Sequence, residues 1–289
     1  MPNIRIFTIK DMMNIGLFVS KGSQDALIKA FIKGMKRFGY VNVELVKNSY
    51  KYWEVEYDLD KYDLVIAYGS YAKLMRECKK LNKCLIIIDF GFLKRENGYF
   101  KISVGHWFPS AYFQNIKHNS KRFNILNLDV KPMRSAGNCI LVAGIGQRSS
   151  TIYNIEHQLW DKNAIKKIKK VTNKKIIYRP RDNTDLNIGN ISYLRSPKVS
   201  NKIFDQASAL VTYASNIAID GLLRGVPCFS EEGVCLKLGL QDLSLINKPQ
   251  IVSYDEQLQF FYDLAYTQWN INEIASGQCF KHLLNENLI

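Results

Sequence analysis

Three short turns in the second half of the chain carry residue types that bind phosphate. The first, GIGQRSS at residues 144–150, follows an apolar run. Gly144 and Gly146 let the backbone approach a ligand closely, and Gln147 and Arg148 add a side-chain amide and a guanidinium. We expect these four residues to contact a nucleotide, although an ordinary strand-to-helix turn has the same composition. The spacing is not GxGxxG, which gives little support to a nicotinamide site.

The second turn, at residues 179–181, ends the strand-like run at 175–178. Pro180 stiffens it and holds Arg179 and Arg181 at the carboxyl end of the predicted strand, where open α/β sheets bind their ligands. A guanidinium can bind phosphate through two parallel hydrogen bonds. We interpret both arginines as phosphate-binding, with a solvated basic loop as the alternative.

The third turn lies within ALVTYASNIAIDGLLRGVPCFS at residues 209–230. Tyr213 ends a predicted strand, and Ser215 and Asn216 begin a helix whose free N–H groups attract phosphate. Asp220 follows one turn later and can reach a hydroxyl group. We expect these four residues to contact a phosphorylated ligand, and an ordinary connection capped by serine or asparagine is the alternative.

Asp89 is the candidate general base of the first half. It follows the apolar run at 84–88, so we expect it at the carboxyl end of a central strand. Desolvation there would raise its pKa and suit proton abstraction. The alternative is an aspartate that caps the next turn. His106 is a second candidate base, although a histidine between aromatic residues is more often structural.

Four basic or glycine positions in the first half are candidates for acceptor binding. Lys21 and Gly22 precede a predicted helix, where a simple cap is the alternative, and Lys94 and Arg95 lie among aromatic residues. The triplet at 58–60 matches the DxD of metal-dependent transferases, but such triplets are common by chance. We therefore expect no metal requirement.

Alternating strand and helix patterns position these residues. Uninterrupted apolar runs indicate strands buried on both faces of a parallel sheet. In the first half we expect strands at 4–9, 41–46, 64–68 and 84–89. We expect one helix at 23–38 and a second that follows residues 69–70 and ends at about 81. An irregular stretch from 90 to 135 separates the halves.

The second half repeats this alternation, which predicts two doubly wound units. We expect strands at 139–143, 175–178, 209–213 and 226–230, and helices at 151–170, 203–206, 215–224, 255–269 and 272–284. The predicted domains are a first domain at 1–134, a second domain at 135–270, and a terminal helix at 271–289 that packs back on the first domain.

The composition predicts a globular protein whose charge suits an anionic partner, with surface lysines that only aid solubility as the alternative. Apolar residues make up 47 % of the 289 residues, and the net charge is +14, which favours nucleic acid, a phosphorylated donor or anionic lipid. The six cysteines form no CxxC pair and no zinc spacing. We expect a monomer in a reducing cytoplasm. No apolar run is long enough to predict membrane insertion.

Residues 139–230 resemble the donor half of GT-B glycosyltransferases. In SNIAIDGLLRGVPCF, a polar turn precedes a helix that resembles their EALxxGxP segment, with Asp220 where glutamate is commoner. The arginine turn at 179–181 resembles the R-P-H/R-P strand end of capsule-type transferases. The resemblance implies an α/β GT-B fold in which two Rossmann-like domains face a central cleft. It also implies that the domain at 135–270 binds a UDP-sugar donor, through the residues of the three turns described above, and that the domain at 1–134 binds the acceptor. An inverting enzyme of this type would use Asp89 as its base.

Three classes of function fit this resemblance. The first is a phage DNA glycosyltransferase that moves a glucosyl or arabinosyl group to 5-hydroxymethylcytosine in double-stranded DNA, with the base extruded from the duplex. The second is a glycosyltransferase of capsule or lipopolysaccharide synthesis. The third is a non-catalytic nucleotide- or DNA-binding protein. The net charge of +14 leads us to rank the DNA-modifying enzyme first.

Overall fold

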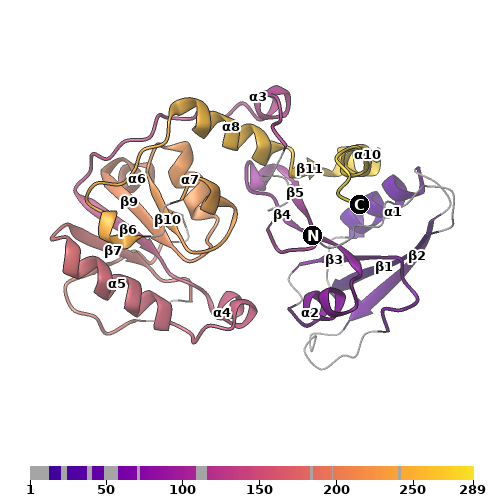
Figure 1. Ribbon diagram of the computed structural model, residues 1–289, viewed down its shortest axis with the longest axis horizontal. Helices are drawn as coiled ribbons and strands as arrows, with labels where there is room; N and C mark the ends of the chain where they lie inside the picture. The colour runs from indigo at the N-terminus through magenta and orange to yellow at the C-terminus, as the bar shows by residue number, and fades with distance from the viewer. Residues whose placement is uncertain are drawn as a thin grey trace. The chain divides into compact units, whose positions relative to one another are not determined.

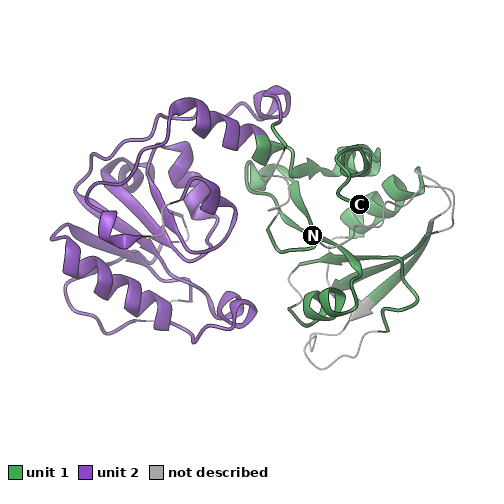
Figure 2. Ribbon diagram, in the orientation of Figure 1, with its two compact units in different colours: residues 1–117, 263–289 green, residues 118–262 purple. Residues whose placement is uncertain are grey.

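The computed structural model forms two compact units (Figures 1 and 2). The first unit comprises Met1–Lys117 with Asp263–Ile289, and the second comprises His118–Tyr262. The structure describes residues 13–20, 25–37, 41–48, 58–69, 72–108, 116–182, 185–196, 198–239 and 242–289. The expected strand at 4–9, together with Lys21 and Gly22, lies outside these residues.

The first unit contains a six-stranded sheet in the order β11-β5-β4-β3-β1-β2. Its strands are β1 (Met13–Ser20), β2 (Val41–Asn48), β3 (Leu64–Tyr68), β4 (Cys84–Phe90), β5 (Tyr99–Val104) and β11 (Gln268–Asn270). The first four are parallel, whereas β5 is antiparallel to β4 and β11 is antiparallel to β5. The buried runs of β3 and β4 match the pattern that predicted strands covered on both faces.

Helices cover both faces of this sheet. They are α1 (Asp25–Lys36), α2 (Ala72–Lys80), α9 (Ile271–Ala275) and α10 (Gln278–Asn285). On one face, Phe31 of α1 meets Phe280 of α10 edge to face at 5.0 Å. On the other face, Leu74 and Cys78 of α2 pack on β3 and β4. Residues near the end of the chain therefore belong to the same core as β1.

The second unit contains a five-stranded parallel sheet in the order β10-β9-β6-β7-β8. Its strands are β6 (Cys139–Ala143), β7 (Lys175–Arg179), β8 (Ser192–Tyr193), β9 (Ala207–Thr212) and β10 (Cys228–Ser230). Its helices include α3 (Lys121–Leu126), α4 (Gln147–Tyr153), α5 (Leu159–Val171), α6 (Asn201–Gln206) and α7 (Ile217–Leu223), while α8 (Tyr254–Ala265) crosses the boundary between the units.

The α/β fold with two mainly parallel sheets is as predicted, but several elements differ. The strand β1 was missed because Asn14 and Gly16 interrupt its apolar run. The expected helix at 151–170 is divided into α4 and α5, since Asn154 and Gln158 adopt positive φ angles of 54° and 65°. The expected helix at 272–284 is likewise divided at Gly277, where φ is 81°.

The units also divide at different residues from the boundaries expected at 134 and 270. Residues 118–134 belong to the second unit, partly because Lys131 N–H donates to Leu223 O and Arg134 N–H to Gly225 O. Residues 263–270 belong to the first unit, where β11 pairs with β5. Neither pairing could be inferred from local sequence patterns.

Candidate functional site

The three predicted donor turns meet at the carboxyl end of the sheet in the second unit. They follow β6, β7 and β9, which are adjacent in that sheet. Ala143 at the end of β6 is in register with Arg179 on one side and Thr212 on the other. The residues of all three turns therefore lie at the end of the sheet where open α/β folds bind ligands.

A buried carboxylate supports the glycine turn from below. Asp161 Oδ1 accepts a 3.0 Å hydrogen bond from the Ile145 N–H, and Oδ2 accepts one of 2.8 Å from the Tyr178 hydroxyl. Burial raises the pKa of Asp161, and the two hydrogen bonds oppose that shift. A Cβ on Gly144 would lie 2.6 Å from the Tyr178 hydroxyl oxygen, so only glycine fits this position without a shift of its neighbours.

A second carboxylate occupies the start of α4. The Gln147 N–H donates to Asp182 Oδ2 at 2.6 Å, so this amide is already hydrogen-bonded. Gly146 lies against the side chain of Arg181, whose Cγ would be 2.7 Å from an added Cβ. Arg181 and Arg148 are both exposed. At this turn the two exposed guanidinium groups are therefore better candidates for phosphate binding than the Gln147 N–H.

Arg179 reaches toward a segment that sequence reasoning did not include in the site. Its Nε donates to Ser196 O at 3.3 Å, and its side chain is half-buried. Arg195 lies in the same segment, pairs with Asp185, and packs over the Tyr193 ring at 5.3 Å. Arg195 is not among the predicted site residues, because it follows the two-residue strand β8, which is too short to show a strand pattern in the sequence.

The polar turn after β9 is held mostly by its own hydrogen bonds. The Ser215 N–H donates to Thr212 Oγ1 at 3.1 Å, and the Ile217 N–H to Ser215 Oγ at 3.4 Å. Asn216 is the residue before α7 and is half-buried. Asp220 lies on α7, where its charge adds to the rise that burial causes in the pKa of the Cys228 thiol.

Tyr213 belongs to an aromatic cluster that sequence reasoning did not predict. Its ring centroid lies 4.9 Å from that of Tyr153 and 5.7 Å from that of Trp160. Trp160 Nε1 donates to Glu231 Oε1 at 2.7 Å, and the Glu232 N–H donates to Tyr213 O at 2.7 Å. Because two of these residues lie on helices and two follow β10, only the tertiary fold brings them together.

Charge is divided across this end of the sheet. Arginines flank β6 and β7, at positions 148, 179 and 181, and outnumber the carboxylate of Asp182, which lies among them, whereas Glu231 and Glu232 follow β10 at the other side. A phosphate group is attracted to the arginines, and carboxylates suit sugar hydroxyls, which donate hydrogen bonds. This distribution fits a ligand with an anionic part and a neutral polyhydroxylated part.

In the first unit, Asp89 lies at the carboxyl end of β4, as predicted from sequence. Its Oδ1 accepts a 2.9 Å hydrogen bond from the Phe90 N–H, and its Oδ2 lies 4.0 Å from Lys101 Nζ. The side chain is 26 % exposed, so the full desolvation expected of it is absent, because Asp89 lies near the strand end. The exposed part of the Asp89 side chain is accessible to a molecule in solution.

His106 is separated from Asp89 along the β4–β5 hairpin. Asp89 pairs with Lys101, whereas His106 follows Val104, which pairs with Ile86 nearer the start of β4. The imidazole is exposed, and its Nδ1 accepts a 3.3 Å hydrogen bond from the Phe108 N–H. The register therefore places the two candidate bases toward opposite ends of β4.

The loop between β4 and β5 carries Lys94 and Arg95. Lys94 is half-buried with φ of 50°, and Arg95 is exposed. Gln268 of β11 holds the loop, since its Oε1 accepts hydrogen bonds from the Phe92 and Leu93 N–H groups at 2.9 and 2.8 Å. Gln268 was not predicted, because nothing in the local sequence links β11 to this loop.

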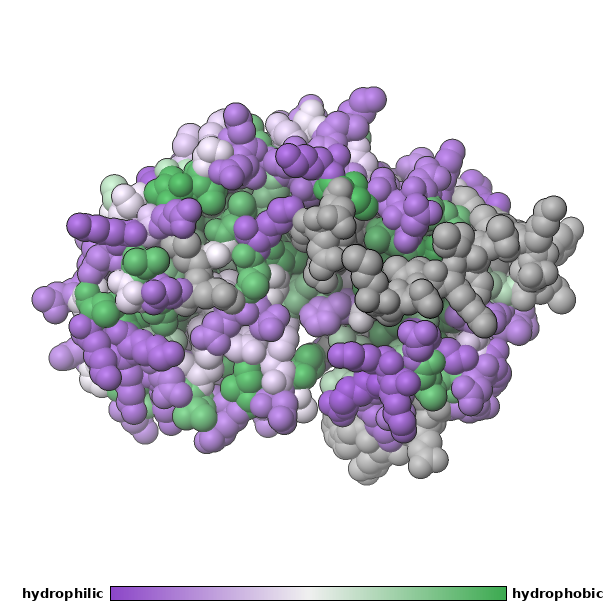
Figure 3. Space-filling view, in the orientation of Figure 1, coloured by the Kyte–Doolittle hydropathy of each residue, from purple (hydrophilic) through white to green (hydrophobic). Residues whose placement is uncertain are grey.

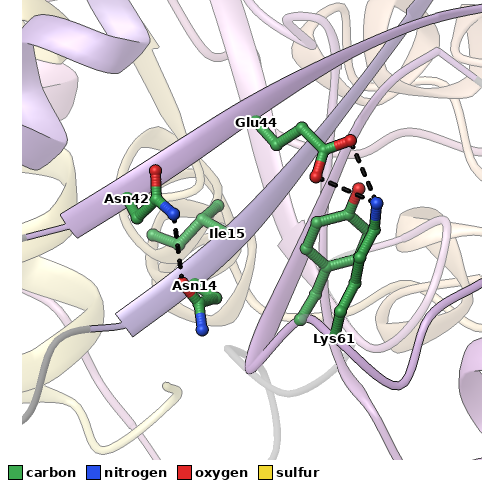
Figure 4. Close-up of a pocket in the computed structure, with 6 residues that line it drawn as sticks. Asn14, Ile15, Asn42, Glu44 and Lys61 are labelled. Atoms are coloured by element: carbon green, nitrogen blue, oxygen red, sulfur yellow. Dashed lines mark hydrogen bonds and ion pairs between the residues drawn. The ribbon is translucent and has the colours of Figure 1, made fainter.

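A pocket of about 230 Å³ opens at the other end of the same sheet (Figure 4). It is lined by Asn14, Ile15, Asn42, Glu44, Lys61 and Tyr62, none of which was a predicted site residue. Figure 4 shows the Glu44 carboxylate facing Lys61, and the two atoms that pair most closely lie 3.0 Å apart. Each partner shifts the other's pKa: that of Glu44 is lowered and that of Lys61 raised, chiefly by their hydrogen bond.

The aspartates of the DxD triplet lie close to this pocket in sequence. Asp58 and Asp60 are exposed, and Leu59 between them is buried in the core. The triplet thus positions a core leucine, and both carboxylates remain in solvent.

The outer face of α5 is hydrophilic and carries several lysines. Lys166, Lys167 and Lys170 are exposed, while Ile165 and Ile168 on the opposite face are buried. Figure 3 shows hydrophilic residues over this helix. Among the described residues, no helix is both long and apolar enough to span a bilayer.

Comparison with known proteins identifies the fold. No family model and no curated protein matches the sequence. Two solved structures from Thermosulfurimonas dismutans are similar over nearly the whole chain. The KpsC beta Kdo 2,7 transferase is 14 % identical, with a TM-score of 0.55 over 92 % of this chain and 99 % of that chain. The KpsC beta Kdo 2,4 transferase is 11 % identical, with a TM-score of 0.52 over 97 % and 99 %. These likenesses confirm the predicted α/β fold of the GT-B glycosyltransferases.

Proposed function

We propose that this chain is a glycosyltransferase that moves a sugar from a nucleotide-sugar donor to a hydroxyl group of a capsule or lipopolysaccharide glycan. The observation that carries the proposal is the meeting of three ligand-type turns, two of them with arginines, at one end of the sheet in a GT-B fold. The full-length likeness to two Kdo transferases favours a glycan acceptor over DNA.

In this proposal the second unit binds the donor. Arg148, Arg179 and Arg181 neutralise the phosphate leaving group, which lets the reaction proceed without a metal ion. Tyr213, Ser215 and Asn216 contribute contacts beside β9, together with Gly144, Gly146, Gln147 and Asp220. A UDP-sugar is the donor that we expected from sequence, and it remains a proposal.

The first unit supplies the general base and the acceptor contacts. Asp89 takes the proton of the acceptor hydroxyl as the oxygen attacks the anomeric carbon, and the bond from that carbon to the phosphate oxygen breaks with its electron pair. Lys94 and Arg95 are the described candidates for acceptor contact. A monomeric state and a cytoplasmic location belong to the same proposal.

A DNA acceptor is the second candidate, and the net charge of +14 is the observation that favours it. One experiment separates the two. The chain is incubated with a panel of uridine and cytidine nucleotide sugars, including a Kdo donor, and with either glycan acceptors or hydroxymethylated duplex DNA. Mass spectrometry then identifies the product. If the sugar is found only on nucleosides from the digested DNA, the proposed glycan acceptor is wrong. If no pair of donor and acceptor gives a product, the proposed glycosyltransferase activity is wrong.

A further inference from the structure

Lys101 is a buried lysine that the proposed reaction does not use. It lies on β5 between β4 and β11 and is 1 % exposed. In the antiparallel register it is directly paired with Asp89. Lysine is almost never fully buried without a partner, so the groups around its ammonium are the first evidence for its role.

Three aromatic rings and one carbonyl surround the Lys101 ammonium. Its Nζ lies 4.3 Å from the ring centroid of Trp107, 5.2 Å from that of Phe108 and 5.3 Å from that of Phe92. These distances allow cation–π attraction. The ammonium also donates a 3.0 Å hydrogen bond to Trp107 O, an acceptor shared with Ser103 Oγ at 3.3 Å. Such contacts hold Nζ in one place.

Stability alone does not explain a lysine at this position. Burial lowers the pKa of Lys101 to about 8, and the Asp89 carboxylate opposes that shift. A lowered pKa means that folding disfavours the charged form. Replacing a buried ion pair with apolar residues of similar volume is often neutral or stabilising, and methionine fits an aromatic cage well.

We propose that Lys101 is a positioning residue that fixes the carboxylate of Asp89 in the orientation needed to take a proton from the acceptor. This inference rests on the proposed role of Asp89 as the base. Oδ1 of Asp89 accepts a hydrogen bond from the Phe90 N–H, and Oδ2 lies 4.0 Å from the buried Lys101 ammonium. Both carboxylate oxygens are thereby restrained, while a quarter of the side chain stays open to solvent.

The first test measures the coupling of the two residues without any enzyme assay. The side-chain ¹³Cε signal of Lys101 is titrated by NMR in the wild-type chain and in Asp89→Asn. We expect a pKa near 8 in the wild type and a lower value in the variant, because the variant lacks the carboxylate that raises it. Identical values would overturn the inference.

The second test measures turnover and donor affinity. We expect Lys101→Met to fold, to lower kcat by roughly 10–100-fold, and to leave the donor KM unchanged. In an Asp89→Asn background the same replacement has no further effect, because Lys101 acts through Asp89. The matched control is Lys61→Met, which removes an exposed lysine–carboxylate pair of the same unit and leaves kcat unchanged.

The outcomes separate this inference from the proposed function. Full activity of Lys101→Met, or losses that add in the double variant, would overturn the positioning role alone. A wild-type chain that transfers no sugar, yet shows the expected lower pKa of Lys101 in Asp89→Asn, would overturn the proposed function and keep the coupling of the pair.

Discussion

The Tyr178 hydroxyl donates a 2.8 Å hydrogen bond to Asp161 Oδ2, and both residues are only 1 % exposed. The pair lies directly beneath Gly144, whose N–H donates to Arg179 O at 3.0 Å. Asp161 also accepts a hydrogen bond from the Ile145 N–H, so it links the glycine turn to the strand that ends in the arginine turn. The hydrogen bond from Gly144 to Arg179 joins the two turns directly. The shape of the candidate donor site depends on side chains that cannot themselves touch a ligand.

Gly144→Ala tests how closely this pair packs beneath the turn. The new methyl group would lie 2.6 Å from the Tyr178 hydroxyl oxygen and 3.0 Å from Asp161 Oδ2, and overpacking of this kind costs about 1–3 kcal/mol. Urea denaturation should show a lower free energy of unfolding. Gly189→Ala is the control, because an added Cβ there meets nothing within 4 Å. Equal stability of the two variants would contradict the packing described.

Asp161→Asn tests the pH dependence of stability. Folding raises the pKa of Asp161, so the folded chain binds that proton more tightly, and this contribution to stability is lost as pH rises above the ordinary aspartate value of 3.8. Asparagine does not ionise, so the variant should gain stability relative to the wild type between pH 4 and 7. Thermal melts across this range measure the difference.

Asp242→Asn gives the opposite sign and serves as the control. Hydrogen bonds from Ser244 lower the pKa of Asp242, so its contribution is present above the ordinary aspartate value and lost as pH falls. The variant should lose stability relative to the wild type as pH rises. The same slope for both variants would show that at least one of the two carboxylates is not in the environment described.

Replacing Arg179 and Arg181 together with glutamine tests the donor site. Loss of charge-assisted hydrogen bonds to phosphate should weaken nucleotide binding about ten-fold or more, as measured by calorimetry with UDP and CMP. Lys166→Gln with Lys167→Gln removes the same charge from the outer face of α5 and should leave binding unchanged. Equal loss in both double variants would point to net charge rather than to a site.

Asp89→Asn tests the general base. We expect kcat to fall by about 10²–10⁴-fold with nucleotide affinity unchanged, measured by initial rates and calorimetry. Asp58→Asn is the control, and it also tests the DxD triplet. Its activity should match the wild type, since Asp58 is exposed. A large loss in Asp58→Asn would revive the metal-dependent alternative.

Local sequence predicted the donor end of the sheet better than the first unit. The runs that form β6, β7 and β9 each end in glycine, arginine or small polar residues, so both the strand and its turn were visible. Lys101 shows what local patterns miss. Between Phe100 and Ile102 a lysine looks solvent-facing, yet the turn that contains Trp107 covers it. The supporting groups Asp161 and Gln268 were missed for the same reason.

The contribution of β11 to the first unit has a consequence for synthesis on the ribosome. That sheet takes its outer strand, and the glutamine that secures the Phe92–Leu93 loop, from residues translated after the whole of the second unit. The second unit is continuous in sequence and can fold as soon as it emerges. The first unit, although translated earlier, must wait with an open edge and an uncovered α1 until β11, α9 and α10 leave the exit tunnel. The order of translation and the order of completion of the two units are therefore reversed.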